Sequence, residues 1–161
     1  MNFADYQILA SRTEKPLDIN WRLAHGALGL ASELAELRES DCDYREECGD
    51  LLWYSALLAN SRGLVLGCGE IPHIGFEALD IIEATISCIA DLIKGKVIYG
   101  KSLDEDRLSS YLNVIVASVA DIGYVSGFTL EECMEANIQK LRVRYPDAYK
   151  DEYAIARLDK K

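Results

Sequence analysis

The chain has 161 residues, half of them hydrophobic, which is enough for one domain with a substantial core. Its 27 acidic and 17 basic residues give a formal net charge of −10 at pH 7. Phosphate backbones and anionic membranes attract clustered Lys and Arg, so this charge argues against nucleic acid and membrane as partners. A free nucleotide that arrives with its metal ion is not excluded by the charge.

The cysteines and the apolar segments indicate a cellular compartment. There are five cysteines, an odd number without a Cys-x-x-Cys spacing, which argues against a disulfide framework and a structural zinc site. No apolar leader is visible near the first residue, and no apolar run approaches the roughly 20 residues that cross a bilayer. We therefore expect a soluble cytoplasmic protein.

Apolar residues recur at helical spacing from the beginning of the chain. Residues 3–11 form the first predicted helix, and a polar segment that contains Pro16 ends it. Two longer helices are expected at residues 20–39 and 46–60. The polar segment SDCDY lies between them and predicts a turn, so these two helices form an antiparallel hairpin.

The second half of the chain predicts three further helices. Residues 76–92 and 104–122 have long apolar patterns, and the glycine-punctuated segment KGKVIYGKS between them is expected to be a loop. Thr129 and Glu132 have the spacing of a capping box, which opens a last helix over residues 129–142. Each pair of long helices is therefore joined by a short connection.

These elements predict an all-α fold, because no segment alternates as a strand does. We expect a four-helix-bundle core of two helical hairpins, with short helices toward both ends of the chain. A single domain covers residues 1–161, with hairpins at 20–61 and 74–124 and a final helix at 129–145. The charged tail after Tyr149 is expected to dock loosely or fray.

Two acidic pairs at helical spacing lie in the first hairpin, Glu33 with Glu36 and Glu47 with Asp50. Residues three apart share a helix face, so each pair projects in one direction. If the chain reverses in SDCDY, Glu36 lies level with Glu47. Glu33 then lies level with Asp50. Each carboxylate alone suits a solvated surface, but four together shift pKa values or bind a cation. Oxygen ligands favour Mg²⁺, with Mn²⁺ as a substitute.

These acids also carry a family resemblance. SELAEL followed by REECGDLLWY resembles the E-x-x-E and E-x-x-D motifs of the MazG-like all-α nucleoside triphosphate pyrophosphohydrolases. EANIQKLRVRYPDAY is similar to the end of that domain, and MNFADYQILASRT to the start of small phage and bacterial members. The similar segments cover most of residues 1–63 and 127–149. The chain departs from the family in its shorter gap between Glu36 and Glu47 and in a long insertion.

The resemblance implies a Mg²⁺-dependent hydrolase that converts a (d)NTP to the (d)NMP and pyrophosphate. Water attacks the α-phosphorus, and the four carboxylates hold one or two metal ions. Glu36 or Glu47 also accepts the proton, and the sequence does not choose between them. Narrower relatives, of the dimeric dUTPase or phosphoribosyl-ATP pyrophosphatase type, remain alternatives. A non-catalytic helical bundle that has kept the acidic seam is the alternative from another class.

Five further residues are candidates for binding the substrate. Asn137, Lys140 and Arg144 form one polar stripe on the last helix, which suits either a solvated face or phosphate binding. The resemblance favours phosphate binding, with Lys and Arg holding phosphate oxygens and Asn donating a hydrogen bond. Tyr54 and His25 lie one and two turns from the acidic pairs and are predicted at the same cavity, with ordinary packing as the alternative for each.

The insertion resembles a degenerate copy of the acidic hairpin. Thr85 and Cys88 align with the first acidic pair, and Leu108 and Tyr111 align with the second. We expect these four side chains to form a dry seam that backs the acidic hairpin within one chain. The apolar character of residues 81–93 also predicts association of whole chains into a homo-oligomer, a dimer or larger.

Overall fold

The computed structural model describes residues 1–40, 44–68 and 77–160, and within them the chain is helical without a strand. The all-α fold predicted from the sequence is confirmed. The turn expected in SDCDY and most of the loop before the third long helix lie outside these residues. The helices are α1 Phe3–Ser11, α2 Ile19–Glu39, α3 Tyr44–Arg62, α4 Ala78–Tyr99, α5 Glu105–Ser126, α6 Leu130–Arg144 and α7 Asp151–Ala156, followed by a short 3₁₀ turn, η2 Leu158–Lys160.

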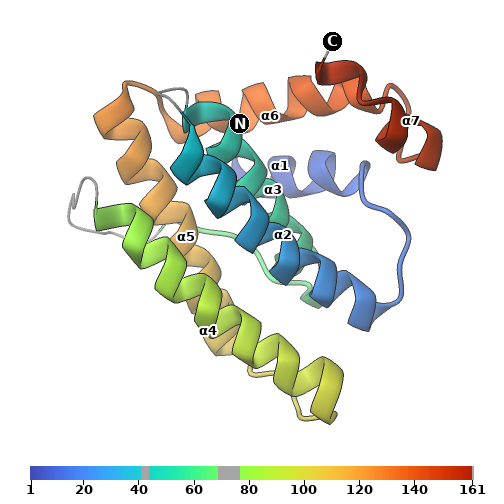
Figure 1. Ribbon diagram of the computed structural model, residues 1–161, viewed down its shortest axis with the longest axis vertical. Coiled ribbons are helices and arrows are strands. Elements are labelled where there is room, and N and C mark those ends of the chain that lie inside the picture. Colours follow the sequence, from blue (N-terminus) through green and yellow to red (C-terminus); the bar gives the residue numbers. More distant parts are fainter. Residues whose placement is uncertain (41–43, 69–76, 161) are drawn as a thin grey trace.

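The four long helices pack as two pairs (Figure 1). The first pair is α2 with α3 and the second is α4 with α5, and the pairs meet where α2 contacts α4 and α3 contacts α5. α6 and α1 lie against α3 outside these four helices. The inserted helices therefore pack on the acidic hairpin rather than away from it. The fully buried side chains between the helices include Leu23, Leu30, Leu37, Leu51, Leu52, Leu58, Ile82, Ile89, Leu108, Leu112 and Ile115.

Side-chain caps begin the helices that position the site. The Asp18 carboxylate accepts hydrogen bonds from two backbone N–H groups at the start of α2, and Asp104 accepts one at the start of α5. The predicted capping box is present at α6, where Thr129 and Glu132 each bond the other's backbone N–H. These caps satisfy N–H groups that have no partner within the helix.

α4 is longer than the sequence predicted. It continues through KGKVIY, which was expected to be a loop, and ends only at Gly100. Gly95 lies inside the helix, whereas Gly100 has a φ of 65° and takes the left-handed conformation that ends a helix. The sequence prediction was wrong because a glycine within a helix costs only about 1 kcal/mol, which packing of the apolar face offsets.

The segment after α6 also differs from its prediction. The tail was expected to dock loosely or fray, and its residues 151–160 form α7 and η2, which contact α6. The Asp159 carboxylate receives two hydrogen bonds from Arg144, and its side chain is 1% exposed. A buried ion pair to a structured helix therefore holds this segment over the molecule.

The seam predicted from the degenerate repeat is dry only in part. Thr85 and Leu108 are buried, and Tyr111 is half-buried, with the guanidinium of Arg107 over its ring. Cys88 is exposed, so its predicted place in the seam was wrong. The prediction aligned Cys88 with Glu36 and so assumed that α4 turns the same helical face inward as α2, but α4 turns this position to solvent.

Within the residues that the structure describes, one helix is long and apolar enough to cross a membrane by length and composition. In α5 an 18-residue window reaches a mean hydropathy of 1.4, and 56% of that window is buried inside the protein. The sequence predicted no such segment. The contacts of α5 with α3 and α4 are those of a core helix, which passes the same test of length and hydropathy.

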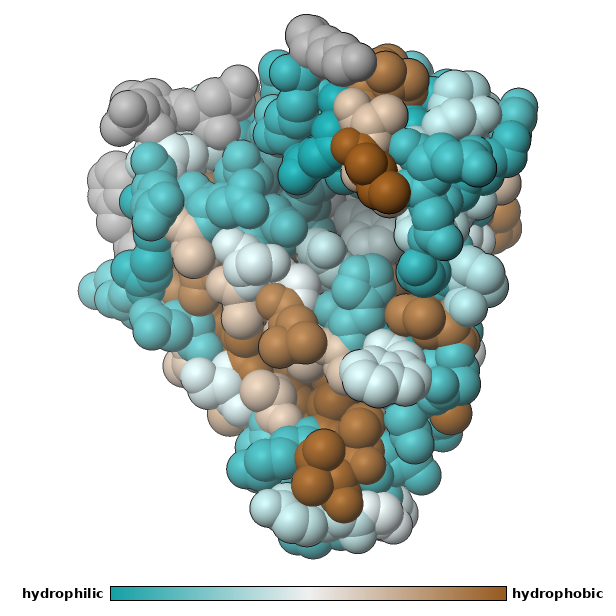
Figure 2. All heavy atoms as spheres, turned by 45° about the vertical axis from the view of Figure 1, so that its right-hand side comes forward, coloured by the Kyte–Doolittle hydropathy of each residue, from teal (hydrophilic) through white to brown (hydrophobic). Residues whose placement is uncertain are grey.

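Some large apolar side chains face outward. Figure 2 shows apolar residues as a band among hydrophilic ones, running toward the narrow end of the molecule in that view. Trp21, Leu28, Ile98 and Tyr99 are each about two-thirds exposed. Association of whole chains stays a prediction, but its stated basis was wrong, because Ile82, Ile86, Ile89 and Ile93 in the segment 81–93 are buried within the chain.

A close approach between α2 and α3 gives a prediction about stability. A Cβ added at Gly29 would lie 2.0 Å from the Tyr54 ring, against which His25 and Trp53 pack edge to face, so the ring could yield only by breaking these contacts. We expect Gly29→Ala to lower the free energy of unfolding by about 1 to 3 kcal/mol, measured by urea or thermal denaturation. Gly95→Ala is the control, because its nearest atom would be 3.6 Å away. It should stabilise by up to about 1 kcal/mol, and a Gly29 variant as stable as the wild type would contradict the tight contact.

Candidate functional site

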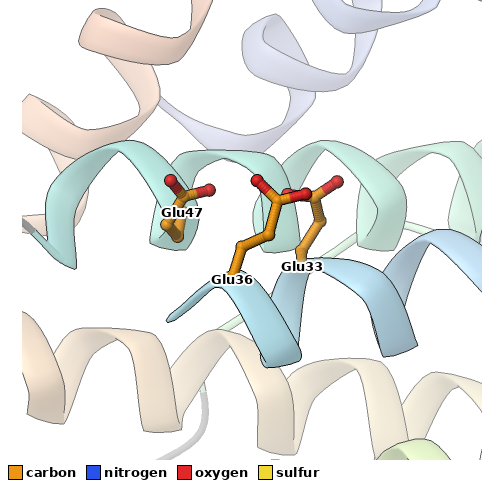
Figure 3. A group of neighbouring side chains, drawn as sticks. All are labelled: Glu33, Glu36 and Glu47. Carbon is orange, nitrogen blue, oxygen red and sulfur yellow. The ribbon is translucent and has the colours of Figure 1, made fainter. Parts of the chain in front are cut away.

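Three of the four predicted acids form one cluster. Glu33 and Glu36 come from α2 and Glu47 from α3, and one carboxylate oxygen of each lies within 4.8 Å of the others. Figure 3 shows the three side chains with their carboxylates turned to the same side of the two helices. Glu36 is exposed and the other two are half-buried, so the cluster opens to solvent on one side.

The fourth acid, Asp50, is held by residues of α6. Its Oδ1 accepts a 2.9 Å hydrogen bond from the Asn137 amide, and its Oδ2 pairs with the Lys140 ammonium. Asn137 is itself fixed by the Tyr6 hydroxyl, which donates to its Oδ1 at 2.9 Å. Gly49 permits this approach, since a Cβ there would lie 3.0 Å from the Cβ of Asn137. Asp50 is therefore oriented by a hydrogen-bond chain that runs from α1 through α6.

The cluster perturbs the ionisation of its members. Burial, followed by the charges of Asp50, Glu36 and Glu47, raises the pKa of Glu33 to about 8. Burial and the neighbouring carboxylates also raise the pKa of Glu47. Burial raises the pKa of Asp50 against the opposing effect of Lys140. Without a cation, the folded protein therefore holds a proton at neutral pH on Glu33, which is ionised in the unfolded chain.

The donor set fits a hard divalent cation. One Glu47 oxygen, Oε2, is buried without a hydrogen-bond partner in the described structure, which is a costly state for a carboxylate oxygen. A cation between Glu33, Glu36 and Glu47 would satisfy this oxygen and offset the repulsion in the cluster. Oxygen-only ligands of this kind are those that Mg²⁺ takes, usually together with water and substrate phosphates.

Three of the four acids line a small cavity of about 160 Å³ that also has basic residues in its wall. Glu33, Glu36 and Asp50 form one side, and Arg144 from α6 lies on another. The lining is completed by Trp53, Tyr54, Leu141, Tyr145, Arg157 and Lys160. A ligand that carries both a cation and anionic oxygens matches such a surface.

The predicted substrate-binding residues are placed in different ways. Tyr54 and Arg144 line the cavity, while Asn137 and Lys140 reach it through Asp50. His25 packs edge to face on Trp53 and Tyr54 and is not among the residues that line the cavity, so it supports their rings. Burial, then the charges of Glu33 and Asp50, raise the pKa of Tyr54 to about 12, so its hydroxyl remains a hydrogen-bond donor at neutral pH.

Four residues near the site were missed by the sequence reasoning. Tyr6 is separated from Asn137 by 131 positions, and nothing in the pattern of the first helix marks its hydroxyl. Arg157 and Lys160 belong to the tail that was expected to dock loosely or fray, and for Trp53 core packing was expected rather than stacking on a base. The clustering of basic residues around Asp159 was a signal, but a charged tail alone does not say where it docks.

The raised pKa of Glu33 predicts how stability changes with pH. Between 4.5 and about 8 the folded state binds a proton that the unfolded state has released, so this group makes the folded state less stable as pH rises. In metal-free buffer, Glu33→Gln should therefore gain stability relative to the wild type from pH 5 to pH 8, measured by chemical denaturation. Saturating Mg²⁺ should reduce this difference, because bound metal stabilises the wild type by mass action. A constant difference across this range would contradict the raised pKa.

Comparison of the chain with protein-family models, curated proteins and solved structures gives no match.

Proposed function

We propose that this protein is a Mg²⁺-dependent nucleoside triphosphate pyrophosphohydrolase built on a four-helix bundle of the MazG-like type. The observation that carries the proposal is the cluster of Glu33, Glu36 and Glu47 oxygens within 4.8 Å, two of whose members, Glu33 and Glu36, line a cavity together with Arg144. The reaction releases pyrophosphate from a (d)NTP and leaves the (d)NMP. The chain's acidic motifs, which resemble those of this family, support the same conclusion.

In this proposal the acids hold the metal and the bases hold phosphate. Glu33, Glu36, Glu47 and Asp50 are the metal ligands, with Asp50 oriented by Asn137. Bound Mg²⁺ supplies a lowered pKa for the attacking water and neutralises charge on the pyrophosphate leaving group. Each carboxylate must be ionised to serve as a ligand, so binding of metal displaces the proton that Glu33 otherwise holds.

One carboxylate also accepts the proton of the attacking water. Glu36 is exposed at the mouth of the cluster, and Glu47 has one buried oxygen without a partner. Glu36 or Glu47 could accept the proton on one carboxylate oxygen while its second oxygen holds the cation. Lys140 and Arg144 donate to phosphate oxygens, and the Tyr54 hydroxyl donates to the sugar or a phosphate.

The size of the cavity bears on which part of the nucleotide it holds. Its volume of about 160 Å³ is below the roughly 300 to 1,000 Å³ typical of sites that enclose a whole small molecule. We propose that the polyphosphate and metal occupy it and that the base lies outside, near the exposed side of Glu36. This arrangement predicts weak discrimination between bases.

The test is a panel of the eight common (d)NTPs assayed for pyrophosphate release, with and without Mg²⁺. We expect release from several of them in Mg²⁺ or Mn²⁺ and none in excess chelator. Preference for dUTP alone, or for phosphoribosyl-ATP added to the panel, would support the narrower alternatives. No release from any substrate, together with no Mg²⁺ binding in calorimetry, would overturn the proposal.

A non-catalytic bundle is the second candidate, and one observation favours it. Lys140 pairs with Asp50 and Glu46, and Lys160 pairs with Glu46, so part of the acidic charge is already neutralised by the protein. Calorimetric titration with Mg²⁺ and a non-hydrolysable triphosphate separates the two candidates. Only the enzyme should bind metal more tightly when the triphosphate is present.

A further inference from the structure

The segment of α7 and η2 is tied to the site by two ion pairs. The Asp159 carboxylate engages the Arg144 guanidinium through Nε and Nη2, and the Lys160 ammonium lies 2.7 Å from a Glu46 carboxylate oxygen. The Asp159 side chain is 1% exposed and that of Arg144 is 17% exposed. These pairs fix the last turn of the chain against α3 and α6.

Each of the two ion pairs has its carboxylate in the lining of one cavity and its cation in the lining of another. Their carboxylates, Glu46 and Asp159, line a cavity of about 360 Å³ beside α6. Their cations, Lys160 and Arg144, line the smaller cavity that holds the acids of α2 and α3. Arg157 lines that smaller cavity as well. Arg144, Arg157 and Lys160 therefore share this cavity with the predicted metal ligands, whereas Asp159, which pairs with Arg144, lines the larger cavity.

The backbone at Arg157 is unusual. It has a φ of 44° and a ψ of 54°, and it is the only residue besides glycine with a positive φ in the described part of the chain. Side chains with a Cβ rarely adopt this conformation, and Gly or Asn is the common choice at such a helix end. An arginine here is unfavourable for local stability alone, and its place in the lining of the acidic cavity is the compensating feature.

We infer that Arg157 and Lys160 bind phosphate oxygens of the metal-bound polyphosphate beside Arg144, and that Asp159 is a positioning residue that holds Arg144 from behind. This inference rests on the proposed function, and it adds Arg157 and Lys160 to Lys140 and Arg144 as the cations that hold the phosphate. A guanidinium with its Nε edge on a carboxylate still has N–H groups on its other edge, which suits a bridge between Asp159 and phosphate.

The experiment is calorimetric titration of the full chain, first with Mg²⁺ alone and then with inorganic tripolyphosphate in excess Mg²⁺. The variants are Arg157→Asn, which removes the charge and tolerates the left-handed backbone, Lys160→Gln and Asp159→Asn. Lys150→Gln is the matched control, because it removes a positive charge from the same part of the chain, where Lys150 pairs with Asp147 on the surface. Thermal melting of each variant checks the fold.

We expect Arg157→Asn and Lys160→Gln each to weaken tripolyphosphate binding about tenfold or more, since each removes a charge-assisted hydrogen bond. Binding of Mg²⁺ alone should become tighter in both, because a cation beside the acids is gone. Asp159→Asn should weaken tripolyphosphate binding with Mg²⁺ affinity little changed, and Asp159→Glu should restore part of it. Lys150→Gln should behave as the wild type.

Three results would overturn the inference. Unchanged tripolyphosphate binding in Arg157→Asn and Lys160→Gln would remove both from the site, and equal losses for Mg²⁺ and tripolyphosphate would assign them a structural role. Tighter tripolyphosphate binding in Asp159→Asn would mean that Asp159 blocks Arg144. Each of these results leaves the proposed function standing if the wild type binds and hydrolyses a nucleotide. A wild type that binds neither Mg²⁺ nor tripolyphosphate overturns the proposed function, and the inference with it.

Discussion

Glu47→Gln is expected to lower the Mg²⁺-dependent turnover by roughly a hundredfold or more while the fold stays intact. The substitution keeps the shape of the side chain but removes a charge from the metal ligands, and a lost metal interaction is worth several kcal/mol in the transition state. Glu47 is the best position for this test because it belongs to the acidic cluster and has a buried oxygen without a hydrogen-bond partner among the described residues. The measurement is the rate of pyrophosphate release at saturating Mg²⁺.

The same variant should melt at the same temperature as the wild type or higher when metal is absent. One negative charge fewer relieves repulsion in the cluster, whereas bound Mg²⁺ would stabilise only the wild type and reverse the comparison. Glu39→Gln is the matched control, because Glu39 is an exposed carboxylate at the end of the same hairpin outside the cluster. Near-wild-type rates in Glu47→Gln would refute the metal site.

Lys140→Ala is expected to lower kcat/KM for the nucleotide by roughly ten- to a hundredfold. The Lys140 ammonium pairs with Asp50 and lies 3.4 Å from a Glu46 carboxylate oxygen. Its side chain is only 13% exposed, so water cannot easily take over its role when the side chain is removed. A charge-assisted hydrogen bond to phosphate is worth about 1.5 to 3 kcal/mol, which sets this range. The loss should appear mainly in KM if Lys140 contacts the substrate equally in the ground and transition states.

Binding of Mg²⁺ alone should become tighter in Lys140→Ala, since the cation that neutralises Asp50 is removed. This opposite response of metal and nucleotide separates a phosphate ligand from a residue that merely supports the fold. Lys94→Ala removes a comparable ion pair, with Asp91, on the exposed face of α4 and should change neither quantity. Weaker binding of both ligands in Lys140→Ala, with a lower melting temperature, would assign Lys140 to structure.

The helical elements and the acidic pairs were predictable because both depend on short-range spacing. Apolar residues every three or four positions predicted the long helices, and the i, i+3 spacing of Glu33 with Glu36 predicted their shared face. The capping box at Thr129 and Glu132 was predictable for the same reason, since its two hydrogen bonds join neighbouring residues. Interactions of this kind join residues within one helical turn, so a short stretch of sequence is enough to predict them.

The length of α4 and the docking of the tail were not predictable in this way. Gly95 and Gly100 look alike in the sequence, and only Gly100 adopts the left-handed conformation that ends the helix. The tail is rich in charged residues, which predicts loose docking or fraying unless a partner for its charges is known. Asp159 finds that partner in Arg144, on a helix whose position depends on α1 and α3.

By itself, the sequence determined the all-helical class and the shared helix face of each acidic pair, Glu33 with Glu36 and Glu47 with Asp50, because residues three apart on a helix need no tertiary contact to share a face. The tertiary structure alone decided the rest of the site. It brought Asn137 and Lys140 to Asp50, and it turned Arg157 and Lys160 toward the acids. These residues lie about 90 or more positions from the acids of α3, and contacts over such separations depend on how whole helices pack rather than on any local pattern.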